Sequence, residues 1–347
     1  MDAEGRDLLE RHNPILVLFP QEPHTRRRPG ARRPGLVGWG DYHPCSAEFF
    51  LARVRLRDRA KSHDLGGLIR RAWWRAERTG LEALRQKLAN VDPAATATWE
   101  LDLAEIPSQN EARAWKTYRR LLQEKDAPYG CVAYGRYVLG SSGRALQYWY
   151  LYIYNDFQNN HEADWESVVI ELGPDGTPAE IGVSCHQRGY HRSWASAPKH
   201  GDRPLVFVAR GSHGGYFRYR PEGYSPLELL RTANVPAAAR FLSPTWRGRA
   251  TLRGWLDHPP ADPLLHPTAP VHDKGTRVEP ELRVFPNVPE AGDPAWWWLA
   301  DHGTWGSAQT RFMGSVGVDS PWGARGQTER WGDPVGWLRS LRDSEPG

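Results

Sequence analysis

The chain has 347 residues, of which 39% are hydrophobic and 25% are charged, and its formal net charge at pH 7 is +4. This balance is typical of a soluble globular protein of one large domain or two, and no run of about 18 apolar residues predicts a transmembrane helix. Three cysteines without a CxxC pair favour neither a disulfide framework nor a thiolate zinc site. The apolar run near the N-terminus is too short for a signal peptide, so we expect a cytoplasmic protein.

The composition also has two local biases. The chain contains 17 Trp but only 2 Met, which favours β-rich packing or a ring-lined pocket. The segment "TRRRPGARRPG", from Thr25 to Gly35, predicts an extended loop that is either solvated or in contact with phosphate or another anionic surface. Neither GxGxxG nor GxxxxGK[ST] occurs, so no motif supports nucleotide binding, and we do not expect a nucleic-acid partner.

The N-terminal third predicts two strands followed by two helices. The run Ile15 to Phe19 predicts the first strand, and "DYHPCSAEFFLARVRL", from Asp41, predicts the second. Apolar residues then recur at helical spacing over 64–89 and 111–125, which predicts two amphipathic helices. Their apolar stripes are most simply faces that pack on the core.

The middle of the chain predicts a sheet. In "LQYWYLYIYND" both alternating faces are apolar or aromatic, which is typical of a central strand covered on both sides. "WESVVIELG" and "AEIGVSCH" are joined by "GPDGTP", which predicts a β-hairpin, and "PLVFVARGSHGGYF" supplies a further strand. One face of the first strand carries Tyr148, Tyr150, Tyr152 and Tyr154, and the other carries Trp149, Leu151 and Ile153.

These elements predict a β-rich α+β fold with an antiparallel β-sandwich core and peripheral helical inserts. We expect a single domain over residues 1–347. Within it, residues 58–126 are predicted to form a helical insert, and residues 226–280 a helical and Pro-rich insert.

Two carboxylates lie at the start of the strand "WESVVIELG". Asp164 and Glu166 are two residues apart, so on a strand they share an apolar face with Val168 and Ile170, whereas Glu171 faces the other way. Burying an unpaired carboxylate costs so much free energy that each acid needs a cation, an arginine or several hydrogen bonds. The sequence therefore predicts a partner for this pair.

Three interpretations of that partner stay open. The first is a divalent cation, because imidazole and carboxylate together are ligands for Mg, Ca, Mn or Zn. The second is a buried ion-pair network with Arg188, Arg192 or Arg210, and the third is a metal-free acid/base pair. The candidate metal ligands are His161, Asp164, Glu166 and His186, and the candidate catalytic residues are Glu166, His161 and His213.

Several segments resemble, in order, the vacuolar protein sorting-associated protein 62-like family. They include "HNPILVLFPQE", "DYHPCSAEFFL", "LQYWYLYIYNDFQNNHEADWESVVIEL", "VSCHQRG", "VFVARGSHGGYF" and "GVDSPWGARGQTERWGDP". The resemblance extends from about residue 12 to residue 337. That family has no settled activity, so the resemblance implies kinship more than function.

The segment "HEADWE" is also similar to the His-x-x-Asp-Trp-Glu motif of the necrosis- and ethylene-inducing peptide-like proteins, which are secreted cytolysins. That likeness implies a β-sandwich in which a divalent cation near the motif supports binding to membrane glycolipids. It implies that His161, Asp164 and Glu166 are the site residues. The N-terminal apolar run predicts no signal peptide and the cysteines predict no disulfide pair, so on these points we expect the chain to depart from that pattern and do not expect secretion or toxicity.

Two functions of different classes follow. The first is a metal-dependent hydrolase in which the cation polarises a bond or activates water, while a Glu or His moves the proton. The alternative is a non-enzymatic module that binds a small molecule, a glycan or a lipid headgroup through an aromatic platform, with peripheral contact to a membrane.

Overall fold

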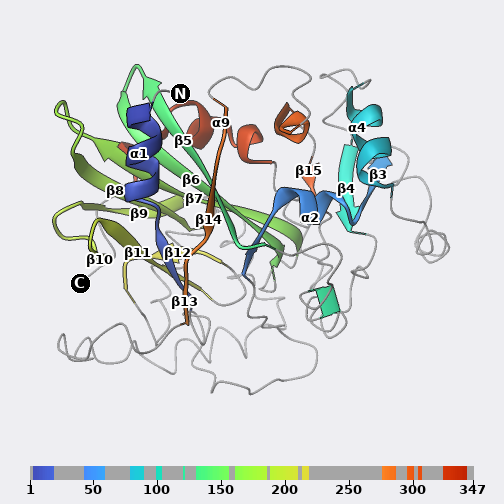
Figure 1. Ribbon diagram of the computed structural model, residues 1–347, viewed down its shortest axis with the longest axis horizontal. Helices are drawn as coiled ribbons and strands as arrows, with labels where there is room; N and C mark the ends of the chain where they lie inside the picture. The colour runs from blue at the N-terminus through green and yellow to red at the C-terminus, as the bar shows by residue number, and fades with distance from the viewer. Residues whose placement is uncertain are drawn as a thin grey trace, which may run out of the picture.

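The computed structural model describes residues 3–18, 43–58, 79–89, 99–103, 120–121, 130–155, 161–185, 188–209, 213–218, 276–286, 295–300, 304–306 and 323–341. Within these ranges the chain has the predicted β-rich α+β fold, in which several sheets pack together and short helices lie around them (Figure 1). No helix among the described residues is both long and apolar enough to cross a membrane.

The largest sheet has the strand order β14-β5-β6-β7-β8-β9. Strand β2 pairs with the part of β6 that extends past the N-terminal end of β5. The neighbours from β5 to β9 are antiparallel, as the sequence predicts, whereas β14 runs parallel to β5. The strands are β2 (Pro44–Cys45), β5 (Val132–Gly140), β6 (Gly143–Asn155), β7 (His161–Leu172), β8 (Pro178–Cys185), β9 (Arg188–Ser193) and β14 (Glu281–Val284).

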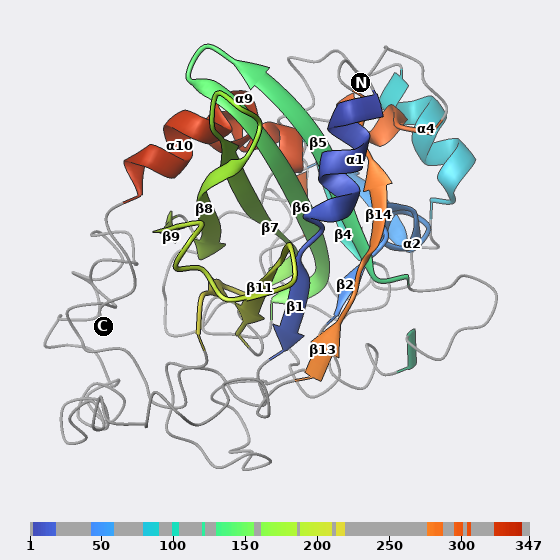
Figure 2. The same ribbon diagram turned by 60° about the vertical axis from the view of Figure 1, so that its left-hand side comes forward.

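A second sheet has the order β10-β11-β1-β13, with β12 paired to β11. It lies in front of the large sheet in the turned view (Figure 2). Here β1 and β11 are parallel, so this sheet is mixed, and the parallel pair joins segments that are far apart in the chain. The strands are β1 (Ile15–Leu18), β10 (Lys199–His200), β11 (Arg203–Val208), β12 (Gly215–Tyr216) and β13 (Thr276–Val278).

A third, small sheet pairs β15 (Thr304–Trp305) with β4 (Trp99–Leu103) and β4 with β3 (Val54–Asp58). Strand β4 lies inside the predicted insert 58–126, so the described part of that insert contributes a strand as well as a helix. Of the predicted helix over 64–89, only 79–89 is described: Leu81–Ala89 forms helix α4, whereas residues 79–80 are not helical, because Gly80 has a φ of 78° and the Thr79 N–H donates to the carbonyl of Val54. Most of the predicted helix over 111–125, and most of the predicted insert 226–280, lie outside the described residues.

The segment predicted as one strand from Asp41 contains helix α2 (Ala47–Leu51) between two strands. The Ser46 hydroxyl accepts a hydrogen bond from the backbone N–H of Phe49 at 3.1 Å and so caps the helix. The strand prediction is therefore wrong here, because a local cap outweighs the β propensity of the aromatic residues. The remaining helices are α1 (Ala3–Arg11), η5 (Trp297–Ala300), η7 (Ala324–Gly326), α9 (Thr328–Gly332) and α10 (Pro334–Ser340).

Strand β6 lies at the centre of the large sheet and is buried on both faces, as its sequence predicts. The second sheet covers the tyrosine face: the ring of His213, just before β12, stacks on Tyr152. The opposite face packs against the C-terminal helices and a group of indole rings. This tryptophan cluster comprises Trp149, Trp165, Trp296, Trp298, Trp305 and Trp331.

The last described helix, α10, begins at a capped aspartate. The Asp333 carboxylate accepts hydrogen bonds from the backbone N–H of Gly336 at 3.0 Å and from the Ser142 hydroxyl at 2.6 Å. The Ser142 hydroxyl, followed by the Gly336 N–H, holds the pKa of Asp333 below its ordinary value. The stability that the Asp333 carboxylate contributes is therefore present above about pH 4 and is lost as the pH falls through the lowered pKa.

We expect Asp333→Ala to lower the free energy of unfolding by about 1 kcal/mol, because it removes the helix cap. Urea unfolding at pH 7 measures the loss. The control is Asp333→Asn, which keeps a capping oxygen and should retain most of the stability. Equal losses in both variants would show that the cap is not the origin of the effect.

Candidate functional site

The three carboxylates of the "HEADWE" segment lie on β7, each opposite a tyrosine of β6. Glu162, Asp164 and Glu166 pair with Tyr154, Tyr152 and Tyr150 respectively. Glu162 is fully buried, the Glu166 side chain is 7% exposed and that of Asp164 is 13% exposed. Strand alternation thus places a row of acids in a largely buried setting, where each must have a partner.

Asp164 is paired with His213, which sequence analysis placed among the catalytic candidates. The His213 Nδ1 lies 3.1 Å from Oδ2 of Asp164, and the imidazole stacks on Tyr152 at 4.1 Å between ring centroids. Burial lowers the pKa of His213, although the hydrogen bond to Asp164 and its charge act in the opposite direction. Because a carboxylate accepts, Nδ1 of His213 carries the proton that is donated to Asp164.

The backbone is strained on both sides of this pair. Ala163, immediately before Asp164, has a φ of 49°, and His213 has a φ of 58°. They are the two non-glycine residues with positive φ among those that the structure describes. Each costs roughly 1–2 kcal/mol, and such strain often concentrates where a site fixes the direction of a side chain. It coincides here with the Asp164–His213 pair.

Glu166 is held by a hydroxyl and faces an arginine. The Ser184 hydroxyl donates to Oε2 of Glu166 and itself accepts from the backbone N–H of Ser167 at 2.6 Å. The Arg330 guanidinium, from α9, lies 3.8 Å from the same Oε2, and its side chain is 13% exposed. Burial lowers the pKa of Arg330, and the charge of Glu166 opposes that shift.

Sequence analysis missed Arg330, although "TERWGDP" stood in one of the segments that carry the family resemblance. Of the three arginines it considered, Arg210 and the side chain of Arg188 lie outside the described residues. The Arg192 guanidinium lies 5.5 Å from the ring centroid of Phe217. The buried ion-pair interpretation therefore applies to Glu166, with an arginine from the C-terminal part of the chain.

His161 is anchored to its own hairpin. Its Nδ1 lies 2.6 Å from the carbonyl oxygen of Ala163, and its Nε2 lies 2.8 Å from the amide nitrogen of Asn155. A carbonyl can only accept, so Nδ1 carries the proton and Nε2 accepts from the amide. Glu162, the next residue, accepts the backbone N–H of Leu103 at 2.7 Å. Both side chains thus connect β7 to neighbouring chain segments.

These contacts bear on the predicted metal site. His161 directs both ring nitrogens at protein groups, and Glu166 is already held by Ser184 and Arg330. His186 lies outside the described residues. Among the residues that the structure does describe, no group of three or more His, Cys, Asp or Glu side chains is placed to hold a metal ion. The described geometry does not fit a cation at these ligands, and metal binding stays a prediction from sequence.

No protein-family model matches the chain, so the resemblance to the vacuolar protein sorting-associated protein 62-like family gains no support. No curated protein matches it either.

Similarity to solved structures is confined to part of the chain. This chain aligns with NLPPya in complex with glucosamine at 18% identity and a TM-score of 0.22, over 24% of this chain and 44% of that one. This chain also aligns with Necrosis and Ethylene inducing Protein 2, from the causal agent of cocoa's witches' broom disease, at 17% identity and a TM-score of 0.22, over 25% of this chain and 41% of that one.

The second of these carries the name of the kind of protein whose motif the "HEADWE" segment resembles. The chain spans less than half the length of either neighbour. At these TM-scores the likeness is too weak to establish a family or a function.

Proposed function

We propose that the chain is a binding module for a hydroxyl-rich ligand, a glycan or a lipid headgroup, and that Asp164 is its main polar contact. The observation that supports this proposal is the rigid setting of the Asp164 carboxylate, which is fixed by His213 and by strained backbone yet remains 13% exposed. A fixed carboxylate can accept hydrogen bonds from neighbouring hydroxyls without losing side-chain entropy on binding.

The metal-dependent hydrolase, the first of the two predicted functions, finds less support in the same contacts. A general base must have its acceptor atom within reach of the substrate. In this structure Glu166 accepts from a buried serine, and His161 accepts from Asn155. Of the three candidate catalytic residues, His213 keeps a plausible geometry for proton transfer through its pairing with Asp164.

We expect Asp164→Asn to weaken ligand binding at least about tenfold, because it removes a charge-assisted acceptor worth about 1.5–3 kcal/mol. The control is Glu171→Gln on the same strand, whose side chain is also 13% exposed but pairs with Arg339 of α10. Ligand-observed NMR with hexoses and inositol measures binding of free ligands, and flotation with glucosylceramide liposomes measures binding of headgroups. Equal weakening in the two variants, or no binding of either kind, would contradict the proposal.

The same preparations test the metal prediction. Purification with added divalent salts followed by elemental analysis should give about one ion per chain if the cation interpretation holds. An ion that is absent from Asp164→Asn and retained in Glu171→Gln would assign the metal to this site. Ligand binding that persists in EDTA would separate the binding function from any metal.

A further inference from the structure

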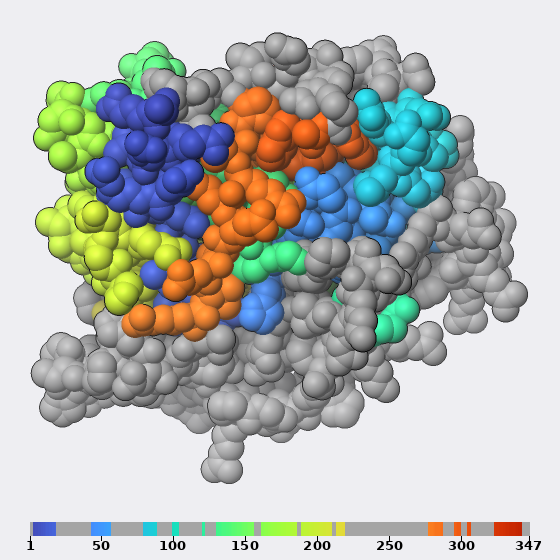
Figure 3. Space-filling model, in the orientation of Figure 1, coloured from blue at the N-terminus to red at the C-terminus, as the bar shows by residue number. Residues whose placement is uncertain are grey.

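A second candidate site lies on the other side of the large sheet, away from Asp164. It is a half-open pocket of about 310 Å³ between α2, α4 and η5, at the lower end of the range for small-molecule sites. Helix α4 and the segment with η5 lie side by side on the molecular surface (Figure 3). The lining residues are Glu48, Leu51, Leu81, Glu82, Arg85, Ala295, Trp297 and Trp298.

Two indole rings belong to this pocket. Trp298 is 2% exposed and packs against Trp165 and Trp305 of the tryptophan cluster, so its ring is fixed. Trp297 is half-buried and makes none of the ring contacts found among the described residues. A half-buried indole beside a fixed one offers a flat apolar surface to a ligand.

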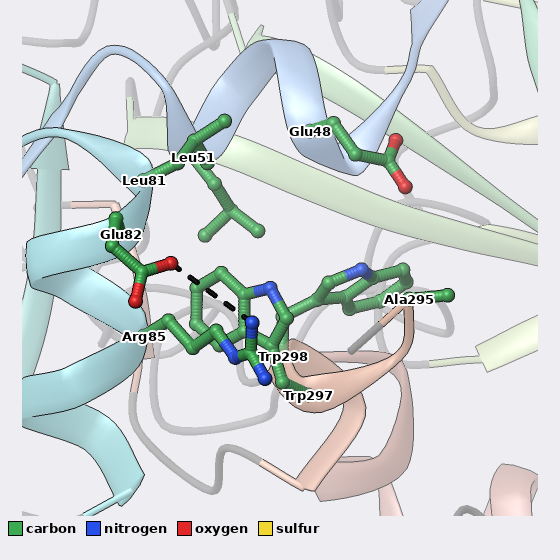
Figure 4. A pocket seen from close by; sticks show the side chains of 8 residues that line it. All are labelled: Glu48, Leu51, Leu81, Glu82, Arg85, Ala295, Trp297 and Trp298. Atoms are coloured by element: carbon green, nitrogen blue, oxygen red, sulfur yellow. Dashed lines mark ion pairs between the residues drawn. The ribbon is translucent and has the colours of Figure 1, made fainter. Parts of the chain in front are cut away.

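Polar groups stand around these rings. The carboxylates of Glu48 and Glu82 lie at opposite sides of the pocket (Figure 4). Oε2 of Glu48 accepts from the Tyr134 hydroxyl at 3.2 Å and from the Arg283 guanidinium at 3.1 Å. Both contacts use the same oxygen, so among the described residues Oε1 is the acceptor left for a ligand.

Each carboxylate of the pocket already has an arginine partner. Glu48 contacts Arg283, which also contacts Glu281, and Glu82 lies 3.9 Å from the Arg85 guanidinium. A cationic ligand would therefore meet little uncompensated negative charge. A neutral ligand with hydroxyl donors and a flat C–H face fits better, because it can stack on indole and donate to Oε1 of Glu48.

We propose that this pocket is a binding site for a single neutral pyranose ring. The ring stacks on Trp297, and a hydroxyl donates to Glu48. The site is independent of Asp164 and would bind a pyranose whether or not the Asp164 site does.

The test is calorimetric and ligand-observed NMR titration with methyl glucoside, galactoside and mannoside. The Asp164→Asn chain is used as the background, so that failure of one site cannot be mistaken for failure of the other. We expect saturable binding of at least one pyranoside, with a dissociation constant of about 1 mM, as suits a half-open pocket with few contacts. Trp297→Leu should weaken it about tenfold.

A matched pair of variants tests the carboxylate. Glu48→Gln should weaken pyranoside binding about fivefold, because a neutral amide is a poorer acceptor than a carboxylate. Glu281→Gln also removes a carboxylate partner of Arg283, at 3.0 Å, but Glu281 does not line the pocket, so binding should be unchanged. The proposal is overturned if no pyranoside binds, if both variants weaken binding equally, or if tetramethylammonium binds more tightly than every pyranoside.

Discussion

Replacing Gly306 with alanine should lower the free energy of unfolding by about 4 kcal/mol. Roughly 1–2 kcal/mol of this loss comes from holding an alanine in a left-handed backbone conformation, and the rest comes from overpacking. Gly306 has a φ of 85°, and an added Cβ would lie 2.4 Å from the carbonyl oxygen of Glu162 and 2.5 Å from its Cβ. Strand β7 cannot move away easily, because Glu162 is fully buried and bonded to Leu103. The added methyl would therefore push directly on the "HEADWE" segment.

Gly176 provides the control for this substitution. It has a φ of 84°, and an added Cβ would meet nothing within 4 Å. Gly176→Ala should thus lower the free energy of unfolding by about 1 kcal/mol, which is the cost of the left-handed conformation alone. Urea unfolding of the two variants measures the difference. If Gly306→Ala costs no more than Gly176→Ala, the close approach of Gly306 to β7 does not exist in the folded protein.

Arg330→Met should lower the free energy of unfolding by about 3 kcal/mol. The substitution keeps most of the side-chain volume but leaves the largely buried carboxylate of Glu166 without its cation. Adding Glu166→Gln to this variant should recover about half of the loss, because the uncompensated charge is then absent. Urea unfolding of the single and double variants measures this coupling.

Arg339→Met is the matched control. Arg339 also joins a C-terminal helix to a glutamate of β7, but its side chain is 57% exposed. Exposed pairs contribute about 0–1 kcal/mol, so this variant should lose little stability. Similar losses of stability in Arg330→Met and Arg339→Met would mean that burial does not distinguish the two ion pairs. If the double variant Arg330→Met/Glu166→Gln is no more stable than Arg330→Met, the uncompensated charge of Glu166 is not the cause of the loss.

Two local patterns of the sequence were informative. Alternation in β6 correctly predicted a strand covered on both faces, and "GPDGTP" predicted the β7–β8 hairpin, in which Gly176 has positive φ. The local signal Asp333–Pro334 also indicates the start of α10.

Pairings between distant segments could not be predicted in the same way. Nothing in β1 or β11 alone specifies that they pair in parallel, and nothing near Glu166 specifies Arg330. His161 was predicted as a ligand because its residue type suits a metal. Its contacts in the structure depend on Asn155 and on the unusual backbone at Ala163, which no spacing rule reveals.

The tryptophan cluster gives the protein an internal optical probe. Several of its indole rings lie 5.3–6.1 Å apart between centroids, close enough for their excited states to couple. The near-ultraviolet circular dichroism of the protein should therefore be dominated by this one region, which includes Trp165 of the "HEADWE" segment and Trp298 of the pocket. A single spectroscopic signal can thus follow the packing of both regions during unfolding or ligand titration.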